Sequence, residues 1–134
     1  MRLTGVIVAG VGDGARFLVI DWVRAAIRAA TGFEPYPGTL NLRLTDPEAC
    51  EHWRAIRGRA GARLTPPDPA TCGGWLVPAR VEGGVPAVIV VPDVTSHPDD
   101  LLEVVAPVHL RAYLGRGEGE AVTLEALADT GPPG

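Results

Sequence analysis

Thr39-Leu40-Asn41-Leu42-Arg43-Leu44 is a stretch in which polar and apolar side chains alternate without a break. In an extended strand successive side chains point to opposite faces, so the leucines share one face and the polar residues share the other. This pattern predicts a half-buried β-strand. The residues before it, Pro35-Tyr36-Pro37-Gly38, predict a turn, because two prolines and a glycine interrupt any regular element.

Short strands of this kind recur on both sides of the stretch. With Thr39–Leu44, the predicted strands are Leu3–Ala9, Arg16–Ile20, Gly74–Val81, Val85–Val91 and Ala121–Leu124. Residues Glu82-Gly83-Gly84 predict a hairpin turn between two of them. The apolar run Leu101–Ala106 receives no element, and Arg57–Gly73 is interpreted as a long loop.

The predicted helices are few and short. Asp21 is a candidate N-cap for a helix over Trp22–Ala30 that Gly32 ends, and a second helix runs from Asp46-Pro47 to about Ile56. Pro107–Leu114 predicts a helical turn. We therefore expect a mainly β protein, a compact six-stranded β-barrel with two or three short helices, over residues 1–127, followed by a disordered tail over residues 128–134.

Composition excludes several classes of enzyme. The sequence contains no lysine, and all 12 cationic side chains are arginines, which excludes a Walker P-loop and the usual protein-kinase fold. Ser96 is the only serine and stands outside a GxSxG elbow, which argues against a serine hydrolase. A formal net charge of -4 argues against general nucleic-acid binding. No apolar run is long enough for a signal peptide or a membrane span, so we expect a cytoplasmic protein.

A glycine-rich loop follows the first predicted strand and reads Gly10-Val11-Gly12-Asp13-Gly14. Glycines at alternate positions let backbone N–H groups converge, which suits phosphate oxygens. A glycine-rich hairpin turn with no ligand is the simpler alternative.

Thr39 and Asn41 are two residues apart on one strand and so share its polar face. Their hydroxyl and amide oxygens are neutral donors of the kind that Mg²⁺ accepts when phosphates supply its other ligands. The alternative is that both residues simply face solvent.

Thr95 and Glu103 form a third signal. Thr95 lies in a polar turn after an apolar run, and Glu103 stands alone among the apolar residues of Leu101–Ala106. A carboxylate in such surroundings either lies on a solvated strand face or is held there for a chemical purpose.

Taken together in their order and spacing, these motifs closely resemble the archaeal CTP-dependent riboflavin kinases. The motifs are Gly10-Val11-Gly12-Asp13-Gly14, Gly32-Phe33-Glu34-Pro35-Tyr36-Pro37-Gly38-Thr39-Leu40-Asn41-Leu42, Val90-Val91-Pro92 with Thr95 and His97, and Glu103-Val104-Val105-Ala106-Pro107 with Leu110-Arg111. The likeness extends from Leu3 to about Leu124, and the segment from Asp46 to Gly73 carries no motif.

The resemblance implies a cradle-loop (RIFT-type) barrel that transfers the γ-phosphoryl group of CTP to the ribityl 5′-hydroxyl of riboflavin, giving FMN and CDP. It implies that Thr39 and Asn41 bind Mg²⁺ and that Thr95 and Glu103 contact the flavin, with Glu103 as the candidate base. The implied nucleotide site consists of Gly10, Val11, Gly12, Asp13, Gly14, Ala15, Val108, His109, Leu110 and Arg111.

Phosphoryl transfer needs neutralisation of spread negative charge. Because the chain has no lysine, Arg111 and Arg16 are the nearest candidate cations. The expected partners are these flavins and cytidine nucleotides, without nucleic acid or membrane, and we expect a monomer.

Two other functions are possible. The first is a non-catalytic sensor barrel that binds flavin or nucleotide, against which the presence of Thr39, Asn41 and Glu103 argues. The second is a DNA-binding barrel of related topology, which the acidic charge balance disfavours.

Overall fold

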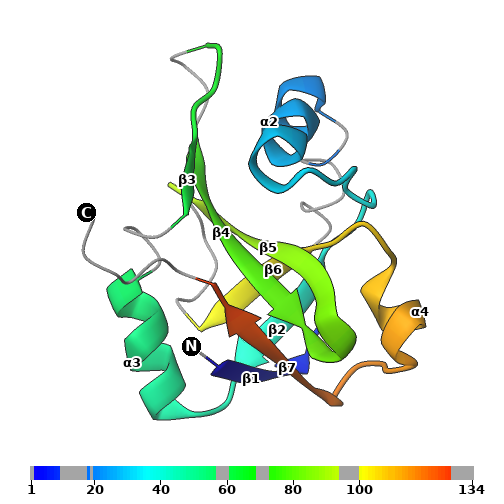
Figure 1. Cartoon of the computed structure of the whole chain (residues 1–134). Coiled ribbons are helices and arrows are strands. Elements are labelled where there is room, and N and C mark those ends of the chain that lie inside the picture. Colours follow the sequence, from blue (N-terminus) through cyan, green and yellow to red (C-terminus); the bar gives the residue numbers. More distant parts are fainter. Residues whose placement is uncertain are drawn as a thin grey trace.

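The computed structural model is a closed β-barrel with helices packed around it (Figure 1). It describes residues 2–9, 18, 20–56, 61–68, 73–93 and 100–127. The strands are β1 (Arg2–Ile7), β2 (Leu40–Leu44), β3 (Ala62–Leu64), β4 (Gly74–Val81), β5 (Val85–Pro92), β6 (Leu101–Val105) and β7 (Ala121–Ala126). Within the described ranges the helices are α2 (Asp21–Thr31), α3 (Pro47–Ile56) and α4 (Leu110–Leu114), with a 3₁₀ turn, η1 (Glu82–Gly84).

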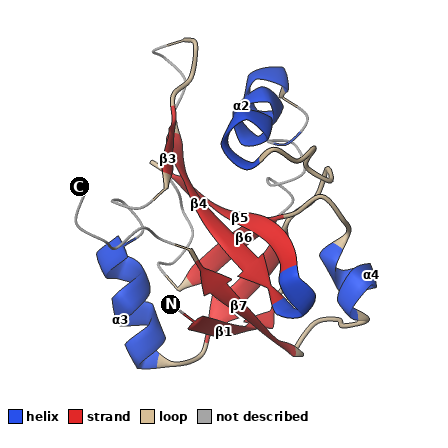
Figure 2. Ribbon diagram, in the orientation of Figure 1, coloured by secondary structure: helices blue, strands red, loops and turns tan. Residues whose placement is uncertain are grey.

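Six strands close the barrel in the order β4-β5-β6-β2-β1-β7, and β7 pairs back with β4. All the pairings are antiparallel, and closure leaves no unpaired edge within this ring. The short strand β3 pairs with β4 outside the ring. The predicted fold class, a mainly β six-stranded barrel with short helices, is therefore confirmed (Figure 2).

The interior of the barrel is one apolar cluster. Leu40, Leu42 and Leu44 point into it from β2, as their alternation predicts. Helix α3 adds Trp53 and Ile56 to the same cluster beside β1 and β2. The three leucines and the helix therefore share one core.

A second apolar cluster lies on the outside of the barrel. Val23 and Ile27 on the buried face of α2 pack there with Val88 and Val90 of β5 and Val105 of β6. Because α2 covers this outer surface, Val88, Val90 and Val105 are buried although they point away from the barrel interior.

Local signals account for most of the element boundaries. Gly32 ends α2 in the left-handed conformation with φ of 80°, and its N–H donates to the Arg28 carbonyl at 2.8 Å. The predicted start of α3 is confirmed, and the Glu48 N–H donates to the Asp46 carboxylate at 3.0 Å. The hairpin turn contains Gly83 and Gly84 at φ of 85° and 84°, a backbone conformation that favours glycine.

Several element predictions were wrong. Of the predicted strand Arg16–Ile20, the structure describes Leu18 in helical conformation and Ile20 as the N-cap of α2, so neither lies in a strand. The sixth barrel strand is instead β6, in the apolar run that received no element. The predicted loop Arg57–Gly73 contains β3.

The predicted N-cap of α2 was also wrong. Ile20 takes that position, with its carbonyl accepting from the N–H groups of Val23 and Arg24 at 3.1 Å each. Asp21 is the first helical residue, where its negative charge suits the helix dipole.

Among the helices that the structure describes, none combines the length and apolar character needed to cross a membrane. The predicted tail, residues 128–134, lies outside the described residues.

Candidate active site at the barrel rim

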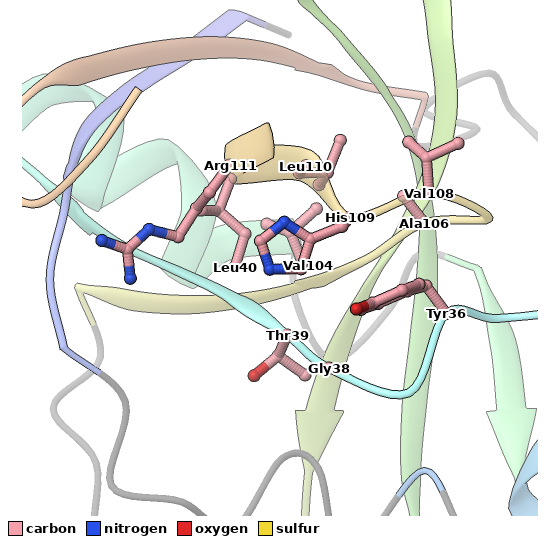
Figure 3. Close-up of a pocket in the computed structure, with 10 residues that line it drawn as sticks. All are labelled: Tyr36, Gly38, Thr39, Leu40, Val104, Ala106, Val108, His109, Leu110 and Arg111. Carbon is pink, nitrogen blue, oxygen red and sulfur yellow. The ribbon is translucent and has the colours of Figure 1, made fainter. Parts of the chain in front are cut away.

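A pocket of about 50 Å³ opens at the rim of the barrel where the turn before β2 meets α4 (Figure 3). Its walls come from three short segments, the turn into β2, the end of β6 and the start of α4. The lining residues are Tyr36, Gly38, Thr39, Leu40, Val104, Ala106, Val108, His109, Leu110 and Arg111.

The floor of the pocket is apolar and its rim is polar. Leu40 and Val104 are cross-strand partners between β2 and β6, and both are buried. Leu110, the first residue of α4, is also buried. The hydroxyl of Thr39 and the exposed side chains of His109 and Arg111 supply the polar groups (Figure 3).

His109 is held by its role as the N-cap of α4. Its Nδ1 accepts a hydrogen bond from the Ala112 N–H at 3.1 Å. A nitrogen that accepts carries no proton, so the neutral ring carries its hydrogen at Nε2. The ring also meets Tyr36 edge to face, with centroids 5.1 Å apart and planes at 80°.

Asn41 and Glu103 are direct cross-strand partners between β2 and β6. Directly opposed residues of an antiparallel pair have Cβ atoms about 4.5–5.5 Å apart on the same face. Both point away from the barrel interior, because the neighbouring Leu40, Leu42 and Leu102 point inward. Glu103 is also opposite Val90 of β5, so the carboxyl group lies on the outer surface where α2 packs.

Asn41 is buried, with 8% of its surface exposed, and Glu103 is half-buried. The alternative in which Asn41 simply faces solvent is therefore wrong. A polar side chain covered to this extent loses water contacts and needs other polar partners in their place.

The end of β1 reaches the same place. The backbone N–H of Val8, which stands just before the glycine-rich loop, donates to the backbone carbonyl of Asn41 at 3.0 Å. The predicted phosphate-binding residues of that loop, 10–15, lie outside the described residues, as do Thr95, His97 and Arg16.

The structure thus brings the described candidate residues to one side of the barrel as two adjoining groups. Thr39 lines the pocket with Val108–Arg111, and two residues later Asn41 faces Glu103. Thr39 lines the pocket and stands two residues before Asn41 in the chain, so it connects the two groups.

The oxygen donors here suit a small hard cation. Threonine hydroxyl, asparagine amide and glutamate carboxylate oxygens are the ligand types of Mg²⁺, which also keeps water or phosphate ligands. Within the described ranges no three His, Cys, Asp or Glu side chains cluster in a way that could hold a metal ion. A site of few protein ligands completed by substrate phosphates is compatible with both observations.

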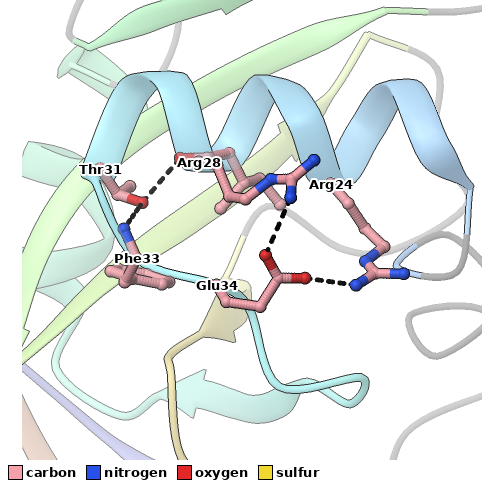
Figure 4. A network of polar contacts seen from close by, with 6 residues as sticks. Arg24, Arg28, Thr31, Phe33 and Glu34 are labelled. Atoms are coloured by element: carbon pink, nitrogen blue, oxygen red, sulfur yellow. Dashed lines mark hydrogen bonds and ion pairs between the residues drawn. The ribbon is translucent and has the colours of Figure 1, made fainter.

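Ion pairs support the segment that leads into the pocket (Figure 4). Glu34 pairs with Arg24 and, at 3.3 Å, with Arg28 on α2, and the hydrogen bond from Arg24 holds the pKa of Glu34 below its usual range. The Thr31 hydroxyl donates to the Ile27 carbonyl at 2.6 Å and accepts from the Phe33 N–H at 3.2 Å. These contacts fix the start of the turn relative to α2.

A second ion pair lies where β5 ends. Arg63 on β3 donates to both carboxylate oxygens of Asp93 at 2.6 Å each, and its guanidinium lies 5.3 Å from the Trp75 ring centre. The hydrogen bonds from Arg63 lower the pKa of Asp93. The segment Asp46–Gly73, in which the sequence showed no motif, therefore holds the end of β5 through Arg63. Thr95 follows this end of β5 in the sequence.

Tyr36 lines the pocket and was not among the predicted site residues. The signal available was its place between two prolines, immediately before the polar stretch that carries Thr39 and Asn41. An aromatic residue in such a constrained turn has little interior to pack against. Sequence alone gave no reason to bring it to His109.

Known proteins resemble this chain over most of its length. The family model CTP-dep_RFKase, described as "Domain of unknown function DUF120", matches residues 7–126. A protein named riboflavin kinase from Pyrobaculum arsenaticum is 37% identical over 133 residues, which cover 95% of this chain and 61% of the relative.

Two further relatives carry the same name. The one from Methanocella arvoryzae is 41% identical over 128 residues, covering 92% of this chain and 56% of the relative. The one from Sulfurisphaera tokodaii is 32% identical over 129 residues, covering 93% of this chain and 94% of the relative.

The chain therefore spans about three fifths of the length of the first two relatives and almost all of the third. The matched region includes every described candidate residue of the site. The chain belongs to the CTP-dependent riboflavin kinase family.

Proposed function

We propose that this chain is a CTP-dependent riboflavin kinase that transfers the γ-phosphoryl group of CTP to the ribityl 5′-hydroxyl of riboflavin, producing FMN and CDP. The observation that carries the proposal is the opposition of Asn41 and Glu103 next to a pocket lined by Thr39 and Val108–Arg111. Acceptor, metal and nucleotide groups are needed at one place for this reaction, and these residues supply candidates for each.

Thr39 and Asn41 are the proposed Mg²⁺ ligands. When bound, the ion would neutralise charge on the phosphoryl oxygens, which is a main requirement of phosphoryl transfer. The buried amide of Asn41 would be held by the β2–β6 ladder, and Thr39 would offer its hydroxyl from the pocket rim.

Glu103 is the proposed residue that orients the ribityl 5′-hydroxyl and accepts its proton. The hydroxyl oxygen then forms a bond to the γ-phosphorus while the bond from that phosphorus to the bridging oxygen of CDP breaks. Thr95 is proposed to contact the flavin beside it. A residue that only orients the hydroxyl, without taking the proton, would have a smaller effect on turnover.

The nucleotide would lie along the rim. Residues Gly10–Ala15 would bind its phosphates through backbone N–H groups, and Val108–Arg111 would contact the remainder. Arg111, which lines the pocket, and Arg16 are the proposed cations toward the phosphates. A planar guanidinium suits phosphate because it can donate two parallel hydrogen bonds.

We further propose a monomeric cytoplasmic enzyme whose partners are these small molecules and not nucleic acid. The net charge of -4 supports the exclusion of nucleic acid. The relatives named as kinases favour catalysis over a non-catalytic sensor barrel.

The decisive experiment incubates the purified protein with riboflavin, Mg²⁺ and each of CTP, UTP and ATP, and measures FMN by chromatography. We expect FMN with CTP above the other nucleotides, and none when EDTA removes the metal. Binding of riboflavin or CTP without FMN from any nucleotide would instead establish the sensor function.

A further inference from the structure

The rim pocket is too small to enclose a whole ligand. Small-molecule pockets usually measure about 300–1,000 Å³, whereas this one has a volume of about 50 Å³. It therefore holds one group of a larger molecule whose other parts lie outside it.

Tyr36 and His109 form an aromatic wall along one side of this pocket (Figure 3). Their edge-to-face arrangement, with centroids 5.1 Å apart, is one of the favoured geometries of aromatic pairs. The wall stands above an apolar floor of Leu40, Val104 and Leu110. A flat, uncharged ring suits this combination, and a phosphate group does not.

Both rings of the wall are attached to fixed backbone. The Tyr36 N–H donates to the Ala106 carbonyl at 2.8 Å, which ties the turn before β2 to the residue after β6. The N-cap hydrogen bond from Ala112 fixes the His109 ring. A side chain added at Gly38 would begin 3.4 Å from the Tyr36 ring, so the turn fits closely beneath it. The wall is therefore formed before any ligand binds.

The polar groups lie at other positions around the pocket. The Thr39 hydroxyl and the Arg111 guanidinium are the groups suited to phosphate, while Tyr36 is 38% exposed and presents its ring at the pocket. A ligand that covers this exposed aromatic ring and the apolar floor beside it would remove apolar surface from water, which favours binding. A nucleotide supplies the matching arrangement, with a flat base at one end and phosphates at the other.

We propose that Tyr36 is a specificity-determining residue, whose ring together with His109 receives the pyrimidine base of the nucleotide. This inference rests on the proposed function and assigns the part of the nucleotide that the wall contacts. The small volume favours a single-ring base over the fused two-ring base of a purine nucleotide. The three-ring flavin fits the same space less well.

The test compares Tyr36→Leu and Tyr36→Phe with the matched control Tyr113→Leu. Tyr113 is on α4, is 56% exposed and lies beside Gly83 of the hairpin turn, outside the pocket lining. Steady-state kinetics give KM for CTP, ATP and riboflavin, and calorimetry gives Kd for CTP and ATP. Circular dichroism reports whether each variant folds. Tyr36→Phe retains the aromatic ring and serves as the second variant if Tyr36→Leu does not fold.

We expect Tyr36→Leu to raise KM and Kd for CTP by roughly 5- to 100-fold, the range expected for loss of one base–aromatic contact. Its KM for riboflavin should stay within about twofold of wild type, and its preference for CTP over ATP should fall. Tyr36→Phe should keep most of the affinity, and Tyr113→Leu should match wild type.

Other outcomes overturn the inference. If Tyr36→Leu raises KM for riboflavin and not for CTP, the wall contacts the flavin. If it changes neither value, the ring has only a structural role. If the wild-type protein makes no FMN, the proposed function fails, and the calorimetric comparison of CTP with ATP still decides the role of Tyr36.

Discussion

Asn41 on β2 lies directly opposite Glu103 on β6, and both side chains point away from the barrel interior. Each belongs to a different sequence motif. The antiparallel register brings an amide and a carboxylate into the contact range of cross-strand neighbours, about 4.5–5.5 Å between Cβ atoms. A proposed metal ligand and a proposed base are therefore neighbours on two rigid strands, a placement that suits precise positioning of reacting groups.

Glu103→Gln tests the proposed base. The amide keeps the size of the side chain but cannot take up the hydroxyl proton, so we expect kcat to fall by roughly 10²–10⁴-fold. Initial rates of FMN formation measure this effect. Glu125→Gln, on the exposed face of β7, is the control and should behave as wild type. Unchanged turnover in Glu103→Gln would leave the residue with a structural role.

Asn41→Ala tests the proposed metal site. Removal of the amide oxygen should abolish Mg²⁺-dependent FMN formation while the circular dichroism spectrum stays that of the folded protein. Arg43→Ala is the control, because Arg43 is two residues further along the same strand and is exposed. An active Asn41→Ala enzyme with ordinary Mg²⁺ dependence would place the metal elsewhere.

Glu82 should make stability depend on pH in the acid range. Its carboxylate accepts hydrogen bonds from Arg116 at 2.6 Å and from the Thr123 N–H at 2.7 Å. These bonds, that from Arg116 first, lower the pKa of Glu82 from the ordinary 4.5. A lowered folded-state pKa means that the stabilisation is present above about pH 4.5 and is lost as pH falls through the lower value.

We therefore expect Glu82→Gln to unfold at a lower urea concentration than wild type near pH 7. The difference should shrink as the pH falls below about 4.5, because protonation removes the advantage of the native carboxylate. Urea midpoints at several pH values measure it. A difference that is the same at every pH would show that ionisation of Glu82 contributes nothing.

Gly5→Ala should destabilise the barrel. Gly5 lies on β1 opposite Leu44, and a Cβ at this position would come 2.8 Å from the Arg43 carbonyl oxygen. Backbone cannot move aside as a flexible side chain does, so we expect a loss of about 1–3 kcal/mol. Chemical denaturation measures it. Gly117→Ala is the control, because its Cβ would approach only the Arg111 side-chain end, at 3.7 Å, and equal losses in both variants would contradict the explanation.

The sequence predicted the elements whose signals are local. Alternation identified β2 and its inward leucines, and the positive φ required at Gly32 and in the hairpin turn matched the glycines placed there. It failed at β6, because four of its five residues are apolar and its outer face carries both Glu103 and the buried Val105, so no two-residue period of polar and apolar side chains is visible. It also missed β3, because three residues are too few to show a period and the strand is defined only by its pairing with β4.

Residue types and spacing singled out the candidate groups: a hydroxyl and an amide two positions apart, an isolated carboxylate, and a set of cations that are all arginine. Their roles were implied by the resemblance of the motifs to the archaeal riboflavin kinases. Only the tertiary structure decided that Asn41 faces Glu103 and that Tyr36 meets His109. The reason is that side-chain periodicity records which face of a strand is buried. It does not record which strand lies next to it, because pairing and register are fixed when the barrel closes around a single core.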